Sequence, residues 1–167
     1  MPTSDDQQAL ERAREDQREG KSPSTQAGEF VREEIDHVRE GVHGAANVKQ
    51  AIAIGLSKAR RAGINLPPAK GPAKSRAQAQ RDLRKGRSPH RKVSSKRSRA
   101  SLRTLQQQST RSASRRALSQ QAHSSARRRG PAARHNSAQK ALQTKGKAGL
   151  RTAARKAART RQRKRAA

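Results

Sequence analysis

Bulky apolar residues gather in one short stretch of the chain, where their spacing is helical. A first set recurs at intervals of four, three and four residues, which is the period of one helix face. A second set with helical spacing follows after two glycines. We therefore predict two helices, at about 28–41 and 48–62, whose apolar faces pack together as a helical hairpin. The residues expected to make this contact are Val31, Ile35, Val38, Val42, Val48, Ile52 and Leu56.

The ends of the second predicted helix carry clear capping residues. Asn47 is a favourable N-cap, and Gln50 stands three residues later, where a capping box has its second member. Gly63 occupies the position at which a left-handed residue ends a helix, and Ile64 is the apolar residue that follows in a Schellman ending. Within the helix, Gly55 lies on the apolar face. Because it has no Cβ, we expect it to let the two helix backbones approach closely.

Polar residues dominate the first 27 positions, which form an acidic lead and a linker. Ser4 and Gln7 have the spacing of a capping box, and oppositely charged pairs at helical spacing continue to Glu19, so a helix is predicted there. Leu10 is the one bulky apolar residue in this helix. We therefore expect the helix to be solvated and to fray, and we expect residues 21–28 to form a linker.

The composition changes sharply after residue 66. Residues 67–167 carry 31 basic side chains and a single acid, Asp82, in a chain of 167 residues whose net charge is +29. Leu, Ile, Val and Phe together make up less than a fifth of the chain, and this scarcity with a high net charge is typical of disorder. We therefore predict a chain that is mostly α-helical where it folds and largely disordered elsewhere. Its three parts are an acidic, partly helical lead (1–27), a helical hairpin (28–66) and a disordered Arg/Lys/Ala/Ser-rich tail (67–167).

Helix-forming residues are nevertheless frequent in this low-complexity tail. Ala, Arg, Lys, Gln and Leu all favour helix, while repulsion among the cations keeps the free tail extended. A polyanion that neutralises the charge removes this repulsion. We therefore expect parts of the tail to become helical on binding, in particular 75–85, 98–122 and 149–165.

The positive charge predicts a polyanionic partner, and nucleic acid is the favoured one, with DNA preferred to RNA. The tail has no aromatic residue, so the stacking platforms that bind single strands are missing. No rigid scaffold aims an arginine at a base edge, so we expect phosphate contacts that are nearly indifferent to sequence. The residues expected to make them are Arg91, Lys92, Lys96, Arg97, Arg99, Arg115, Arg116, Arg127, Arg128, Arg129, Arg155, Lys156, Arg159, Arg161, Arg163, Lys164 and Arg165.

The sequence offers little evidence for an enzyme, a cofactor site, a metal site or a membrane-spanning segment. The chain has no cysteine, no nucleophile elbow and no Walker-type phosphate loop, so we predict that it is not an enzyme and takes no cofactor. His37 has Glu33 and Glu40 at helical spacing, but an exposed, salt-bridged surface explains this pattern better than a metal site. The other histidines, His43 among them, stand alone in sequence expected to be flexible. The longest apolar stretch, 51–56, is too short to span a bilayer.

The segment from Lys49 to Gly63 reads KQAIAIGLSKARRAG. This order of residues resembles the KQAIAIALSEARRAG-like helix of a family of short, basic, uncharacterised bacterial and phage proteins, and the likeness extends over residues 28–66. The resemblance implies a bacterial cytoplasmic setting and supplies no catalytic residues. The end of the tail is similar, in composition alone, to linker-histone tails and to the bacterial proteins that imitate them.

Three functions fit these observations. The favoured one is a histone-like, nucleoid-associated protein that coats or compacts DNA through its tail, while the hairpin self-associates or docks a protein partner. The second is an RNA-binding or ribosome-associated protein. The third is an adaptor whose hairpin binds a protein while the tail anchors to a polyanion. For the acidic lead we favour local ion pairs over a weak competition with phosphate for the tail.

Overall fold

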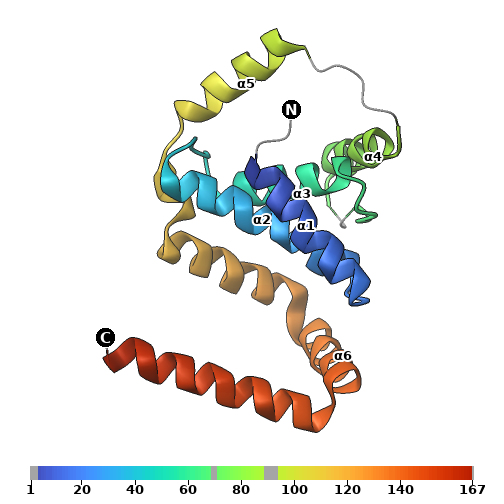
Figure 1. The fold of residues 1–167 in the computed structure, drawn as a ribbon, viewed down its shortest axis with the longest axis vertical. Coiled ribbons are helices and arrows are strands. Elements are labelled where there is room, and N and C mark those ends of the chain that lie inside the picture. Colours follow the sequence, from blue (N-terminus) through green and yellow to red (C-terminus); the bar gives the residue numbers. More distant parts are fainter. Residues whose placement is uncertain (1–3, 69–70, 89–93, 167) are drawn as a thin grey trace. The chain divides into compact units, whose positions relative to one another are not determined.

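The computed structural model describes residues 4–68, 71–88 and 94–166, and it is mostly helical (Figure 1). No strand occurs in these ranges, and no helix in them is long and apolar enough to cross a lipid bilayer. The prediction of a mostly α-helical chain is confirmed, whereas the expectation of a largely disordered one is not, because helices also cover most of the basic tail. The elements are α1 (Ser4–Arg18), α2 (Pro23–Glu40), α3 (Val48–Arg61), α4 (Ala73–Arg87), α5 (Ser95–Gln106), the 3-10 helix η1 (Thr110–Ala113) and α6 (Arg115–Ala166).

Packing divides the chain into two units, Met1–Gln121 and Ala122–Ala167. In the first unit α2 packs on both α1 and α3, and α4 packs on α3. The second unit holds the greater part of α6, whose helical course is interrupted at two glycines. The buried apolar clusters lie in the first unit.

α2 and α3 form the predicted hairpin, and their close packing depends on Gly55. A Cβ at this position would lie 2.7 Å from Val31 Cα and 2.8 Å from the Phe30 carbonyl oxygen. No side chain fits between the two backbones at this point, because real Cβ atoms do not approach other atoms so closely. The close approach predicted for Gly55 is thus confirmed.

The predicted caps of α3 are also confirmed. The Asn47 side chain accepts a hydrogen bond from the Gln50 backbone N–H at 3.0 Å. At the other end Gly63 has a φ of +98°. The Ile64 N–H donates to the Ala59 carbonyl at 3.1 Å, which is the bond of a Schellman motif that spans six residues. Ile64 is buried and supplies the apolar contact that accompanies this motif.

α2 begins earlier than the sequence pattern indicated. It starts at Pro23, so most of the segment expected to be a linker is helical. A proline suits this position because the N–H it lacks would have no partner in the first turn of a helix. Gln26 and Ala27 follow and are both buried, and the Gln26 side chain donates to the Lys21 carbonyl at 2.8 Å. The start of α2 is therefore held to the chain that precedes it.

The expectation that the first helix is solvated and frayed is wrong, because α1 packs along α2 (Figure 1). Ala9 and Ala13 are 0 % and 2 % exposed, and they belong to one apolar cluster with Ala27 and Phe30. Bulky side chains are not needed at such a contact, since the distance between packed helices depends on the side chains that separate them. The acidic lead is therefore part of the fold.

The seven predicted packing residues of the hairpin are buried to different extents. Val38 and Val48 are buried. Val42 requires a correction, since it is 51 % exposed: α2 ends at Glu40, so Val42 lies beyond the helix and off its apolar face. The other four are partly buried, namely Val31, Ile35, Ile52 and Leu56.

Replacing Gly55 with alanine should destabilise the first unit. The added methyl group must push α2 and α3 apart, and overpacking of this kind costs about 1–3 kcal/mol in the free energy of unfolding. Gly28→Ala in α2 is the matched control, because a Cβ there meets no atom within 4 Å. Alanine lowers the free energy of helix formation relative to glycine by up to about 1 kcal/mol. This control should therefore be as stable as the parent protein or more stable. Urea denaturation measures both variants, and equal stability of the two would contradict the close approach at Gly55.

Candidate nucleic-acid interface

The described basic side chains of the predicted interface lie on the surfaces of α5 and α6. Arg91 and Lys92 lie outside the described residues. Lys164 and Arg165 belong to the last turns of α6, and their side chains are outside the described set as well. The others are all exposed: Lys96, Arg97, Arg99, Arg115, Arg116, Arg127, Arg128, Arg129, Arg155, Lys156, Arg159, Arg161 and Arg163.

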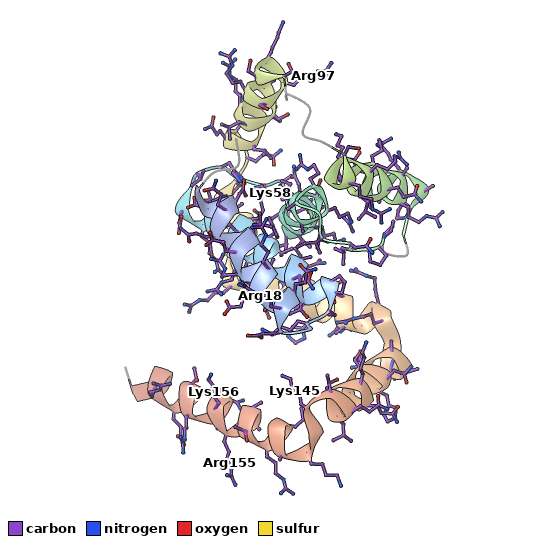
Figure 2. The ribbon with its side chains drawn as sticks, turned by 45° about the vertical axis from the view of Figure 1, so that its right-hand side comes forward. Arg18, Lys58, Arg97, Lys145, Arg155 and Lys156 are labelled. Atoms are coloured by element: carbon purple, nitrogen blue, oxygen red, sulfur yellow. The ribbon has the colours of Figure 1, made fainter. Side chains whose placement is uncertain are left out.

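The last part of α6 presents cations on more than one side. Its basic residues follow one another at 155, 156, 159, 161 and 163, and successive positions of a helix are rotated by about 100°. Figure 2 shows Arg155 and Lys156 leaving the helix in different directions. Such a helix presents positive charge to partners that approach from different directions.

The hydrogen bonds described for three of these guanidinium groups stay within their own helices. Arg128 donates to Ser124 Oγ at 2.9 Å and to Ser125 Oγ at 3.3 Å. Arg99 and Arg161 each donate to the backbone carbonyl four residues earlier in the chain. These exposed groups can exchange such local bonds for a phosphate oxygen without disturbing helix packing.

Two glycines divide α6 into three helical segments. Gly130 and Gly146 have φ of +76° and +65° with ψ of 171°, a conformation that residues with a Cβ rarely adopt. Pro131 opens the second segment, where its fixed φ suits the first helical position. The stretch 149–165, for which helix was expected on binding, lies in the third segment.

α4 carries part of the tail's charge, and Asp82 anchors it to α3. This residue is the only acid after residue 66 in the sequence, and it is 2 % exposed. Its carboxylate accepts hydrogen bonds from Ser57 Oγ of α3 at 2.7 Å and from Gln78 Nε2 at 3.2 Å. Burial lowers the pKa of the Arg60 guanidinium, and the negative charge of Asp82 opposes this shift. The one acid of the tail therefore serves packing and leaves the exposed cations uncompensated.

A second part of the tail docks on the turn between α2 and α3. The Gly44 N–H donates to the Leu105 carbonyl at 2.9 Å. η1 follows, and its Ala113 is buried and accepts a hydrogen bond from Arg39 Nε at 3.2 Å. The first unit thus extends well past residue 66, where the tail was expected to begin.

Sequence reasoning missed a cluster of ionisable side chains among α1, α2 and α3. Glu34 is 0 % exposed, and its Oε2 lies 3.1 Å from Lys58 Nζ, which also donates to Asp6 Oδ1 at 3.0 Å. Burial by itself lowers the Lys58 pKa, but the attraction of the two carboxylates outweighs burial and raises that pKa. His37 and His43 are also buried. The interpretations of His37 as part of an exposed surface and of His43 as isolated in flexible sequence are therefore wrong.

Ion pairs of the acidic lead reach across helices. Arg12 of α1 contacts Glu29 at 2.8 Å and Glu33 at 2.9 Å, both on α2. Burial lowers the Arg12 pKa, but these hydrogen bonds outweigh it and raise the pKa. Asp16 pairs with Lys21 at 2.6 Å. Local pairs in the lead therefore involve Lys21, whereas Arg12, which was expected to pair locally, pairs with α2 instead. Local pairs with Arg14 and Arg18, and competition of the lead with phosphate, stay predictions.

Residues 24–70 match the model of a family described as "Family of unknown function (DUF6496)". The match covers α2, the turn and α3, and it agrees with the resemblance to an uncharacterised family seen over residues 28–66. The chain matches no curated protein and no solved structure.

Removing the Asp82 carboxylate should release α4 while leaving the hairpin folded. Asp82→Ala leaves the Ser57 hydroxyl without its acceptor, and such a loss costs about 1–3 kcal/mol locally. Amide hydrogens of α4 should then exchange about tenfold faster or more, whereas those of α3 should change little. Asp36→Ala, which removes a half-exposed acid from α2, is the matched control. Unchanged exchange of α4 in Asp82→Ala would contradict the anchoring role.

Proposed function

We propose that the chain binds nucleic acid without sequence preference, as a histone-like, nucleoid-associated protein that coats or compacts DNA in the bacterial cytoplasm. The observation that carries this proposal is the surface of α5 and α6. Their described basic side chains are exposed, and the only acid in residues 67–167 is buried in α4. A surface with many cations and no compensating acid is the electrostatic footprint of phosphate binding.

The arrangement of charge favours compaction as well as coating. A helix rises about 1.5 Å per residue, so the nine basic residues among the 20 of segment 147–166 lie about 3.3 Å apart on average along the helix axis. Duplex DNA carries one phosphate charge per about 1.7 Å of its axis, so this helix offers about one cation for every two phosphates. Only one side of a helix can face one duplex. Cations that point in other directions, as Arg155 and Lys156 do relative to each other (Figure 2), are then available to a second duplex. Bridging of this kind draws DNA segments together.

Indifference to sequence follows from the chemistry of the same helices. Reading a base edge requires an arginine held in a fixed direction, or an aromatic platform for stacking. The arginines Arg99, Arg128 and Arg161 hydrogen-bond only locally where contacts are described, and the tail has no aromatic residue. Phosphate contacts position a protein on nucleic acid without reading its sequence.

Salt dependence tests the phosphate contacts directly. If about ten cations of the full chain engage phosphates, log K for a DNA duplex should fall against log salt with a slope of about −9. Neutralising Arg127, Arg128 and Arg129 together with glutamine should reduce this slope by about 2 to 3. The matched control neutralises Arg14, Arg18 and Arg32, which are exposed on α1 and α2, and removes the same charge. Equal changes in slope for the two triple variants would contradict an interface on α6.

Competition between nucleic acids separates DNA from RNA as the preferred partner. The full chain, bound to a labelled DNA duplex, is titrated in matched salt with unlabelled duplex DNA, structured RNA and single-stranded RNA. We expect duplex DNA to compete about tenfold better than either RNA, because the single-stranded platform is missing and the contacts follow a duplex backbone. A tenfold preference for RNA would instead assign the chain to RNA.

A further inference from the structure

The buried cluster among α1, α2 and α3 contains a carboxylate whose charge is only partly matched. Both carboxylate oxygens of Glu34 are buried without a hydrogen-bond partner that meets normal geometry. Oε2 has the Lys58 ammonium 3.1 Å away, whereas Oε1 faces His43 Nε2 at 3.4 Å. That distance is longer than the 2.7–3.2 Å typical of an N–H···O hydrogen bond.

The hydrogen bond on the far side of the His43 ring fixes its neutral tautomer. His43 Nδ1 lies 3.1 Å from the Gly44 carbonyl oxygen, which can only accept, so Nδ1 carries the hydrogen. In a neutral imidazole, Nε2 then has a lone pair, and this lone pair faces the Glu34 carboxylate. Two electron-rich atoms in a buried site require a positive species between them.

His37 repeats this arrangement from α2. Its Nε2 lies 3.2 Å from Asp5 Oδ2 on α1 and 3.5 Å from Glu33 Oε1, and a carboxylate accepts, so Nε2 carries the hydrogen and Nδ1 the lone pair. One ring nitrogen from each of His37 and His43 and one oxygen of Glu34 all lie within 4.8 Å of one another. The two rings meet edge to face, with centroids 5.9 Å apart.

The distance between two of these ligand atoms suits a tetrahedral metal centre. Zinc binds histidine nitrogen and carboxylate oxygen at about 2.0–2.2 Å, which places neighbouring ligand atoms of a tetrahedron about 3.3–3.5 Å apart. The Glu34 Oε1 to His43 Nε2 distance of 3.4 Å falls in this range. Histidines that bind metals usually donate their other N–H to a carboxylate or a backbone carbonyl, as His37 does to Asp5 and His43 to Gly44.

The local charge also favours a divalent cation. Among the described contacts, four carboxylates meet His37, His43 or Lys58, and two permanent cations pair with carboxylates of this group. Glu34, His37 and His43 are buried, and these carboxylates gather around them in a chain whose net charge is +29. The carboxylates are those of Asp5, Asp6, Glu33 and Glu34, and the cations are Lys58 and Arg12, which pairs with Glu33.

We propose that Glu34, His37 and His43 bind one divalent transition-metal ion, with zinc the best match to two imidazoles and a carboxylate. The ion would link His43, in the turn after α2, to Glu34 and His37 of α2. Asp5 of α1 would join this link through its hydrogen bond with His37. Small domains with few large apolar side chains are commonly stabilised by such a metal. The proposed ligands do not belong to α5 or α6. Metal binding can therefore be tested, and can fail, independently of nucleic-acid binding.

The test uses the full chain, free of nucleic acid and of any histidine tag. Cobalt(II) is titrated as a spectroscopic probe, zinc per chain is measured after dialysis, and thermal unfolding is followed with zinc and with a chelator. We expect one ion per chain, the visible absorption of tetrahedral cobalt displaced by zinc, and a midpoint raised by about 5 °C or more at saturating zinc.

Matched variants assign the ligands. Glu34→Gln keeps the size of the side chain and offers His43 an amide hydrogen, so it should fold yet lose the cobalt spectrum and the zinc-dependent midpoint shift. His43→Ala should lose both responses as well. His123→Ala and His135→Ala, which remove exposed histidines of α6, are the controls and should retain both.

Three results would overturn the proposal. One is the absence of saturable binding at one ion per chain. Another is a cobalt spectrum and a zinc-dependent shift that persist in folded Glu34→Gln. The third is a midpoint that zinc and chelator leave unchanged, because the positive species between His43 and Glu34 would then be a proton.

Discussion

The close approach of α2 and α3 at Gly55 sets the geometry of the first unit. Because the two backbones meet there, large side chains are excluded, and the apolar clusters are built mainly from alanine. Phe30 is the only aromatic residue of the chain, and it lies in one of these clusters. A core of small residues buries little apolar area per residue, so helices must come close together to bury any at all.

A small apolar core leaves polar groups to occupy part of the interior. Glu34 and Lys58 meet inside the first unit, and a buried ion pair of this kind costs desolvation that its attraction repays only with good geometry. Such pairs contribute little net stability, but they penalise arrangements in which either charge is left alone. The pair therefore helps to select one register of α2 against α3.

Local signals made the hairpin predictable. Asn47, Gly55 and Gly63 act through their own backbone or through residues a few positions away, so the sequence around each of them is sufficient to assign its role. The burial of α1 was missed because only bulky side chains were counted, and Ala9 and Ala13 carry the contact instead. The tail was expected to be helical only on binding a polyanion, for a related reason. Low hydrophobicity and high charge predict that a segment cannot bury enough apolar surface to form a packed core. They do not exclude helix, because Ala-rich basic segments have a high intrinsic helix propensity without such a core.

The ionisable cluster was beyond what spacing shows. Glu34 and His37 lie at helical intervals from the buried Phe30 and Val38, so their position on the inner face of α2 was available from the sequence. The partners Lys58 and Asp6 come from α3 and α1, and His43 comes from a turn. These side chains come together only when the three helices pack. The spacing of residues along one helix gives no information about such contacts between helices.

The two glycine interruptions of α6 have a kinetic consequence. The segments 131–145 and 147–166 are rods of about 22 Å and 30 Å, and each joins its neighbour through one glycine. Under the proposed function, once one rod had bound a duplex the next would bind at a high effective concentration, and the chain as a whole would leave slowly. Each rod alone would be held weakly, however, so rods would detach in turn and be captured by another duplex. Such a chain would remain bound for long periods in dilute DNA and yet pass quickly between molecules where DNA is concentrated.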